Sequence, residues 1–323
     1  MKNFLTVLCL LACVVTNAQT DSVKVSDTGI RSNFQKNNGR VFLSRDQGDT
    51  WQRVDSGFPE NESINAWATS GTRIIAATDE HGVYISEDGL KSWHPMNNGL
   101  PENLRILALI SHQNLLVAGS YLQGVYVSSN EGDSWEPMNR GLKGRSIRSL
   151  YSAGNRLMAG KDEGIYISQD DGSWSKQMNG VQVNAFAFVN NMLYAATNLG
   201  ALQSHDLGRT WSWAWQDTGA VFDFAVNGSK LVSFTSNKRV YETTSAGTYW
   251  VNLGKNHFTP PSTFRITTSS GEQLIYPWKN VFKSLRNNTP FRSDGLPAET
   301  SFMKILATPY GILVGVGFNG NGC

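Results

Sequence analysis

Short runs rich in apolar residues recur along most of the chain, and such runs bounded by turn residues are the pattern of β-strands. The pattern is clearest at Ile64–Ala68, Arg73–Ala77, Val83–Ser86 and Trp93–Met96. Glycine, serine and aspartate separate these runs, and such residues mark turns. The sequence therefore predicts four short strands in this repeat. The same order of runs returns at residues 104–138, 147–178 and 183–213, and in looser form at 222–253 and 264–291.

Repeats of about 40 residues that each contain four strands are typical of β-propeller blades. The two ends of the chain each hold half of such a repeat: residues 302–307 and 311–317 predict two inner strands, and residues 39–54 predict two outer strands. Because a half blade would leave an unpaired strand edge, we expect the halves to pair. The prediction is an all-β fold, a seven-bladed β-propeller of four-stranded antiparallel blades, with its ring closed by N-terminal outer strands that complete the C-terminal blade.

A recurring segment, which we call the box, links the third and fourth strands of each repeat. It reads SRDQGDTW at Ser44–Trp51 and SHDLGRTW at Ser204–Trp211. Altered copies shift the glycine, replace the aspartate, lack one residue, or keep only a small polar start and an aromatic end. These copies begin at Ser86, Ser128, Ser168, Thr243 and Ser284.

The chemistry predicted for the box is structural. An aspartate at a tight turn accepts backbone N–H groups just downstream, the following glycine supplies a positive φ, and the tryptophan covers the turn. Ser245 and Arg286 take the place of the aspartate in two copies, which suits a turn better than a catalyst or a calcium ligand. The residues assigned to these turns are Asp46, Trp51, Asp88, Trp93, Asn130, Trp135, Asp170, Trp174, Asp206 and Trp211.

The box is similar to the Asp-box, or BNR repeat, of sialidases, sortilin-type receptors, Asp-box glucanases and photosystem II assembly factors. The resemblance covers residues 39–323, and the chain looks most like the assembly-factor type, which is one ring without an appended catalytic domain. A motif of this kind implies an architecture and leaves the activity open.

One position near the start of each predicted inner strand is polar. In a propeller the inner strands line a central channel, so these side chains would surround one mouth of it. The ring consists of Asn65, Arg105, Arg148, Asn184, Asp223, Arg265 and Lys304, with a formal charge of +3 from four cations and one anion. Two interpretations stay open: a solvated lining, or a site that binds an anionic group such as a carboxylate. Aromatic residues predicted on the same side, which would stack on sugars or a peptide, are Tyr121, Trp213, Trp215 and Trp278. For Trp213 and Trp215 the alternative is a place in the alternation of an outer strand.

Three functional classes follow. The first is a non-catalytic binding or assembly module that recognises a protein or glycan. The second is a glycoside hydrolase, because Phe264–Thr267 resembles the Phe-Arg-Ile-Pro motif of sialidases and Arg105, Arg148 and Arg265 would imitate their carboxylate-binding triad. Thr267 replaces the proline, however, and the Asp-box glucanases use paired aspartates where Asp223 stands alone. The third is a spacer within a larger surface complex. We expect the first, with no catalytic residues.

The composition limits the classes of partner and cofactor that we expect the protein to bind. The chain has 323 residues, 31 glycines, 11% aromatic residues and 17% charged residues, which suits a turn-rich β protein with a large core. A net charge of +2 argues against binding nucleic acid or membrane surfaces through bulk charge. The sequence contains no phosphate loop, dinucleotide fingerprint or Cys/His metal spacing, so we expect no cofactor and no metal. The five histidines are scattered, and a solvated loop position is expected for each.

The N-terminus predicts export. Lys2, the apolar run Phe4–Val15 and small residues up to Ala18 form a signal peptide that is too short to span a bilayer. The predicted organisation is a signal peptide at 1–18, a flexible lead-in at 19–38 and one propeller domain at 39–323. We expect a periplasmic or secreted monomer, with lipidation at Cys13 as the alternative. Only Cys323 would remain after cleavage, so packing alone holds the domain.

Overall fold

The computed structural model describes residues 41–254 with short gaps, and then separate strands near the C-terminus. The gaps fall at 47–49, 61, 145, 217–218, 228–229, 238 and 244–249, and the later described segments are 266–269, 272–275, 282–284, 290–291 and 302–317. These residues form strands, turns and bends without a helix, so the predicted all-β class is confirmed. All the strands belong to one compact unit, Gly39–Phe318. Within the described part, no helix has the length and apolar character needed to cross a membrane.

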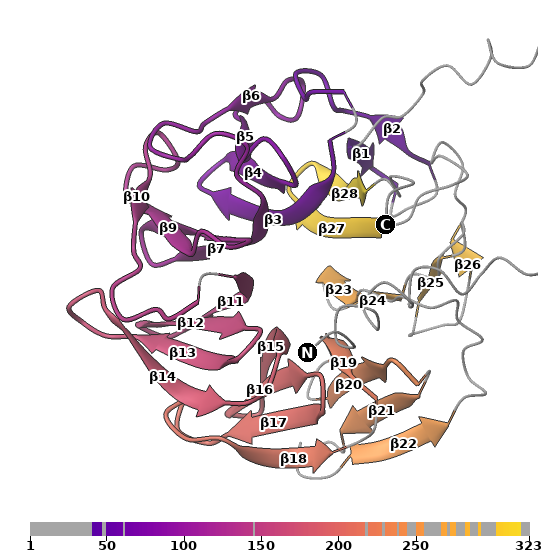
Figure 1. Cartoon of the computed structure of the whole chain (residues 1–323). Coiled ribbons are helices and arrows are strands. Elements are labelled where there is room, and N and C mark those ends of the chain that lie inside the picture. Colours follow the sequence, from indigo (N-terminus) through magenta and orange to yellow (C-terminus); the bar gives the residue numbers. More distant parts are fainter. Residues whose placement is uncertain are drawn as a thin grey trace, which may run out of the picture. The chain divides into compact units, whose positions relative to one another are not determined.

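The described strands assemble into seven antiparallel sheets of four strands each (Figure 1). Four sheets are described almost in full and follow the chain order. The first is β3 (Ile64–Ser70), β4 (Arg73–Thr78), β5 (Val83–Ser86) and β6 (His94–Pro95). The second is β7 (Ile106–His112), β8 (Leu115–Ser120), β9 (Val125–Ser128) and β10 (Glu136–Pro137). The third is β11 (Ile147–Ala153), β12 (Arg156–Lys161), β13 (Gly164–Ser168) and β14 (Trp174–Asn179). The fourth is β15 (Val183–Val189), β16 (Met192–Thr197), β17 (Gly200–Ser204) and β18 (Ser212–Gln216).

Two further sheets follow the same order. The fifth is β19 (Val221–Asn227), β20 (Lys230–Thr235), β21 (Val240–Thr243) and β22 (Trp250–Gly254). The sixth is β23 (Ile266–Ser269), β24 (Glu272–Ile275), β25 (Phe282–Ser284) and β26 (Pro290–Phe291).

The remaining sheet joins the two ends of the chain. It contains β1 (Val41–Ser44), β2 (Gln52–Arg53), β27 (Phe302–Thr308) and β28 (Gly311–Gly317), in the order β2-β1-β28-β27. Strand β1 pairs with β28 in a register that sets Phe42 opposite Val314 and Ser44 opposite Ile312. This is the pairing of N-terminal outer strands with C-terminal inner strands that the sequence predicted.

Apolar side chains fill the space between neighbouring sheets. Ile75 and Ile85 of the first sheet pack in one cluster with Leu109 and Leu116 of the second. Because both faces of a sheet are covered, the middle strand β4 is buried at five of its six positions. This burial explains why its sequence is a continuous apolar run instead of an alternating one. The first strands of consecutive sheets contact each other, and β27 contacts β3 in the same way.

Candidate functional site

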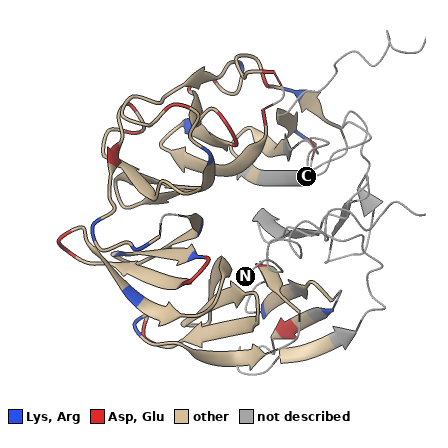
Figure 2. Cartoon of the chain, in the orientation of Figure 1, with Lys and Arg blue, Asp and Glu red and all other residues tan. Residues whose placement is uncertain are grey.

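The alternating strand directions give each sheet two distinct ends. At one end of each sheet lie the loop between its second and third strands and the segment that leads into its first strand. We call this end the loop face. At the other end lie the first hairpin and the box turn, which we call the box face. Charged residues concentrate in loops and near strand ends (Figure 2). The two ends therefore carry most of the chemistry, while the strands between them are apolar.

The box turns are closed by a repeated set of hydrogen bonds. The Thr50 N–H donates to Asp46 Oδ1 at 2.9 Å and its hydroxyl donates to Oδ2 at 2.5 Å. Thr210 bonds Asp206 in the same way, at 2.8 and 2.6 Å. The hydrogen bonds from Thr50 lower the pKa of Asp46 to about 2. Burial opposes the shift at Asp206, but the bonds from Thr210 still lower its pKa to about 2. Each carboxylate is engaged within its own turn, as the structural interpretation requires.

The backbone explains why the glycine of the box shifts by one place. Two consecutive residues after the aspartate have positive φ, as at Leu207 (57°) and Gly208 (87°). In the box that begins at Ser86 the order is reversed, with Gly89 at 76° and Leu90 at 71°. Leu90 is buried in an apolar cluster, so its packing offsets the unfavourable conformation. Either of the two positions therefore accepts the glycine.

The third sheet corrects one assignment. The box pattern in the sequence assigned Asp170 to the turn. In the structure the Ser173 N–H and hydroxyl donate to Asp171 instead, at 2.9 and 2.6 Å. This box is one residue shorter than the others, so the aspartate that reaches the turn lies two residues before the bonded serine instead of four. Asp171 is the turn residue, and the assignment of Asp170 was wrong.

The box tryptophans do more than cover their own turns, because they reach the preceding sheet. The indole N–H of Trp93 donates to the Val54 carbonyl at 2.7 Å, and that of Trp135 donates to the Met96 carbonyl at 2.9 Å. Trp174 repeats the contact with Met138 at 2.7 Å. Trp211 departs from this pattern, since its indole N–H donates to the Gly208 carbonyl within its own box.

A glycine after the outer strand makes these three clasps possible. Gly57, Gly99 and Gly141 have φ of 99°, 86° and 82°. A Cβ atom at Gly99 would overlap the carbonyl oxygen of Trp135, and the same overlap occurs between Gly57 and Trp93. The sequence signal for two of them is the repeated Pro-Met-Asn-x-Gly-Leu at residues 95–100 and 137–142, which lies outside the box pattern.

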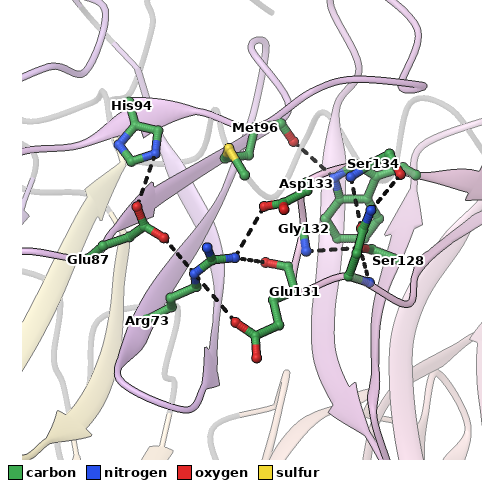
Figure 3. Close-up of polar contacts among 11 residues, drawn as sticks. Arg73, Glu87, His94, Met96, Ser128, Glu131, Gly132, Asp133 and Ser134 are labelled. Atoms are coloured by element: carbon green, nitrogen blue, oxygen red, sulfur yellow. Dashed lines mark hydrogen bonds and ion pairs between the residues drawn. The ribbon is translucent and has the colours of Figure 1, made fainter.

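Arg73 ties the box turns of the first two sheets together (Figure 3). Its Nε atom lies 2.5 Å from a carboxylate oxygen of Glu87 in its own sheet. Its Nη1 atom donates to the Glu131 carbonyl at 3.1 Å and lies 3.2 Å from Asp133, both in the next box. The charge on this part of the box face is thus used for contacts between sheets.

On the loop face, the predicted ring residues do not share one position. Asn65, Arg148 and Asn184 each lie at a register shift one residue after the start of their pairing with the second strand. Leu107 and Phe222 occupy the corresponding shifts in β7 and β19. The shift occurs at the same place in all five strands, but in β7 and β19 it holds an apolar residue. Matching polar residues therefore led to the nearby Arg105 and Asp223 instead.

The other ring members fall elsewhere. Arg105 precedes β7, Asp223 follows the register shift of β19, and Lys304 pairs with Gly315 in β27. Arg265 lies outside the described residues, as does Trp278 among the predicted aromatics, and the side chain of Lys304 is not described. The expectation of one equivalent column is therefore wrong for Arg105 and Asp223.

Two of the asparagines join neighbouring sheets. The Asn65 side-chain amide donates to the Ile106 carbonyl at 3.0 Å, and that of Asn184 donates to the Val221 carbonyl at 2.7 Å. Ile106 and Val221 are the residues at which the next first strand begins its pairing. These polar side chains satisfy backbone groups at the joint between two sheets, which explains their polarity without a ligand.

The two described arginines are already held by carboxylates. Arg105 Nη2 lies 2.6 Å from Asp79 Oδ2, and Arg148 Nε contacts Asp162 Oδ1. The hydrogen bond that Arg105 donates to Asp79 raises the pKa of Arg105. The excess positive charge predicted from the ring residues alone is therefore offset at these two positions by acidic loop residues.

Among the described aromatic candidates, Tyr121 is the exposed one, at 43%. The Arg105 guanidinium lies over its ring, 5.6 Å from the centroid. Trp213 and Trp215 are half-buried and pack against apolar clusters, and Trp215 stacks on Tyr241 with ring centroids 4.4 Å apart. Of the two interpretations of Trp213 and Trp215, the packing favours the outer-strand one, since both lie in β18 and pack against apolar side chains.

Of the histidines expected at solvated loop positions, His112 departs from the expectation, while His81 lies in a loop with a side chain that is 41% exposed. His81 Nδ1 contacts the carboxylate of Glu62, which is 2% exposed and accepts the N–H groups of Asp79 and Glu80 through its other oxygen. His112 is 6% exposed, and its Nδ1 lies 2.7 Å from the Ser152 hydroxyl of the next sheet. Burial lowers the pKa of His112. Within the described part of the chain, no three His, Cys, Asp or Glu side chains gather to hold a metal ion.

Comparisons with solved structures show the propeller fold. The structure of YCF48 bound to D1 peptide aligns with a TM-score of 0.62 and 14% identity, and the match covers 83% of this chain and 96% of that one. The extracellular domain of a protein classed as a one-component system from B. thetaiotaomicron aligns with a TM-score of 0.59 and 13% identity over 74% of this chain and 37% of that one. The GH74 enzyme of Niastella koreensis aligns at 0.51 and 13% identity over 72% and 42%. No family model and no curated protein sequence matches the chain.

Proposed function

We propose that this chain is an exported, non-catalytic β-propeller that binds a protein partner through its loop face. The proposal rests on the side chains that the loop face exposes: Tyr121 is 43% exposed and the neighbouring Leu122 is 59% exposed. Arg105 and Arg148 on the same face form ion pairs with carboxylates of the protein. Exposed aromatic and aliphatic side chains beside a fixed arginine are typical of protein-binding surfaces. The likeness to YCF48, which was solved with a bound peptide, supports the same assignment.

The proposed architecture is a closed ring of seven blades built on Asp-box repeats. The shared sheet of β1, β2, β27 and β28 and the contact between β27 and β3 support closure. The repeated hydrogen bonds of Asp46 and Asp206 support the Asp-box assignment. In this ring the box tryptophans act as clasps between blades, and residues 39–323 form the propeller after a signal peptide at 1–18 and a lead-in at 19–38.

The glycoside hydrolase alternative is less well supported. A sialidase-like triad would need Arg105, Arg148 and Arg265 to converge on a substrate carboxylate, but the first two are paired with acids and occupy different positions along their strands. The GH74 likeness concerns 42% of that enzyme. Asp223 lies in β19, and no aspartate occupies the same register position in β3, β7, β11 or β15.

The channel mouth is proposed as a solvated lining. Asn65 and Asn184 bond the next blade, so they serve the joints between blades. Binding of an anionic group at the mouth would fall to Arg148, Arg265 and Lys304, and a glycan partner remains the second choice. We place the protein in the periplasm or outside the cell as a monomer; the likeness to extracellular domains fits this location, with lipidation at Cys13 as the alternative.

The test combines binding and turnover. The protein lacking the predicted signal peptide would be probed on peptide and glycan arrays and incubated with sialoside and β-glucan substrates. We expect peptide binding without hydrolysis. Hydrolysis that is lost in an Arg105→Ala or Asp223→Ala variant would overturn the proposal in favour of an enzyme.

A further inference from the structure

We propose that one corner of the loop face, formed by Asp79, Glu80, His81, Arg105, Tyr121 and Leu122, docks a partner segment that presents a lysine or arginine beside an apolar side chain. This inference rests on the proposed function, because it names where a protein partner binds and what it must offer. We call these six residues the docking corner. They come from two loops and one linking segment at the joint between the first and second sheets.

Backbone hydrogen bonds hold the docking corner together. The Gly82 N–H donates to the Leu104 carbonyl at 3.1 Å, and the Tyr121 N–H donates to the Arg105 carbonyl at 2.9 Å. The buried Glu62 carboxylate accepts the N–H groups of Asp79 and Glu80 at 2.9 and 3.2 Å. The loops are thus fixed to each other before any partner arrives, and a pre-organised surface loses less conformational entropy on binding.

Leu122 is the most unusual residue of the docking corner. It is 59% exposed and has a φ of 68°, which is unfavourable for a bulky side chain. Leu90, in a box turn, shows the usual compensation for such a conformation, since it is 2% exposed and packs in an apolar cluster. Leu122 has no comparable burial within the chain. Covering its side chain, together with that of Tyr121, would give a partner an apolar anchor at the centre of the contact.

The charges of the docking corner select the partner. Arg105 lies between the Asp79 carboxylate at 2.6 Å and the Tyr121 ring, so its positive charge is already used. Two carboxylates, Asp79 and Glu80, face this single guanidinium, and Glu80 is near enough to contribute to the raised pKa of Arg105. The remaining charge is negative and lies beside exposed apolar surface. A cationic side chain next to an apolar one complements both features.

The corresponding loops of the next two sheets differ. The loop between β12 and β13 presents Asp162 and Glu163, and Asp162 is bonded to Arg148. The loop between β16 and β17 presents Leu199, which is 44% exposed. Leu199 therefore provides a matched control: an exposed leucine on an equivalent loop, two sheets away from the docking corner.

The experiment selects random displayed peptides against the full-length mature protein and measures the affinity of the selected peptides as synthetic probes. We expect the selected peptides to carry lysine or arginine next to leucine, phenylalanine or tryptophan. Leu122→Asp and Tyr121→Ala should each weaken binding by at least about tenfold. Glu80→Lys should weaken it by several-fold and reduce its dependence on salt. Leu199→Asp should leave the affinity unchanged, and the thermal melting of all four variants should match the parent protein.

The outcomes separate the two proposals. If no peptide binds the parent protein, the proposed function fails. If peptides bind the parent protein and Leu122→Asp with equal affinity, the proposed function stands and the docking corner is wrong. If Leu122 is required but the selected peptides are acidic, or if only glycans on an array depend on Leu122, the surface is correct and the stated partner chemistry is overturned.

Discussion

The box face and the loop face end the same strands, yet they are built in different ways. The boxes that begin at Ser44, Ser86 and Ser204 repeat one arrangement, in which an aspartate bonds the hydroxyl residue four positions downstream. The tips of the loops between second and third strands carry unrelated residues, such as Glu80, Leu122 and Glu163. The repeated bonds close a turn that the sheets have in common, and we propose that the varied loops are where a partner binds.

In the first three sheets the last residue of the second strand closes the base of the loop that follows, and it is a hydroxyl residue in two of them and a lysine in the third. Thr78 and Ser120 end the second strands of two sheets, and their hydroxyls donate to the Gly82 and Gly124 carbonyls at 2.9 and 2.8 Å. Lys161 holds the same place in the third sheet. It is 1% exposed, and its amine donates to loop carbonyls while burial lowers its pKa. The base of each loop is thus structural, and only the tip varies freely.

The largest effect is expected from the sheet that joins the two ends of the chain. Deletion of residues 39–54 removes β1 and β2 and leaves the edge of β28 without its partner strand, so the protein should fail to fold. Circular dichroism and thermal melting of the purified deletion variant test this. A soluble variant that melts cooperatively would show that the shared sheet is dispensable.

The second-largest loss of stability is expected from replacing a box tryptophan. Trp135→Ala removes a side chain that is 2% exposed and the clasp to Met96, and should destabilise the protein by about 3–5 kcal/mol. Trp135→Phe keeps most of the apolar volume and loses the N–H donor, so its cost should be smaller. Urea unfolding gives both values. An equal and small effect of the two substitutions would rule out the clasp as a source of stability.

Gly99 tests the same clasp from the other side. Gly99→Ala introduces a Cβ atom that would overlap the Trp135 carbonyl oxygen at a φ of 86°, so we expect a loss of more than about 1 kcal/mol. Gly71→Ala is the control, since its φ is also positive, at 56°, but no atom lies within 4 Å of the added Cβ. If both substitutions cost the same, the close approach to Trp135 does not matter and only the backbone conformation does.

The box aspartates should give a smaller and pH-dependent effect. Asp206→Ala removes the bonds from Thr210 and should cost about 1 kcal/mol at neutral pH. The pKa of Asp206 falls from 3.8 to about 2 in the folded protein, so its contribution is complete above about pH 4 and is lost as the pH falls towards 2. Asp206→Asn should flatten this part of the stability profile, measured by urea unfolding across the acid range. An unchanged profile would contradict the role of the carboxylate.

Features that depend on residues close together in the sequence could be predicted, and contacts between different sheets could not. The alternation of Ile64–Ala68 and the turn residues after it are sufficient to place strands, because each strand must bury its apolar positions. The partners of Arg105 and Trp135 were not predictable in this way, since Asp79 and Met96 belong to neighbouring blades and meet them only in the folded chain. The ring prediction failed for Arg105 and Asp223 because it assumed a polar residue in every strand, whereas Leu107 and Phe222 occupy the equivalent positions.

The most direct test of the division between a structural box face and a functional loop face measures stability and binding in the same samples. Asp206→Ala and Tyr121→Ala would be compared with the parent protein by thermal melting and by affinity for a selected peptide well below the melting temperature. The account predicts that Asp206→Ala lowers the melting temperature by a few degrees and keeps its affinity, while Tyr121→Ala keeps its melting temperature and loses at least about tenfold in affinity. An Asp206→Ala protein with full stability and no binding would contradict the division between a structural box face and a functional loop face.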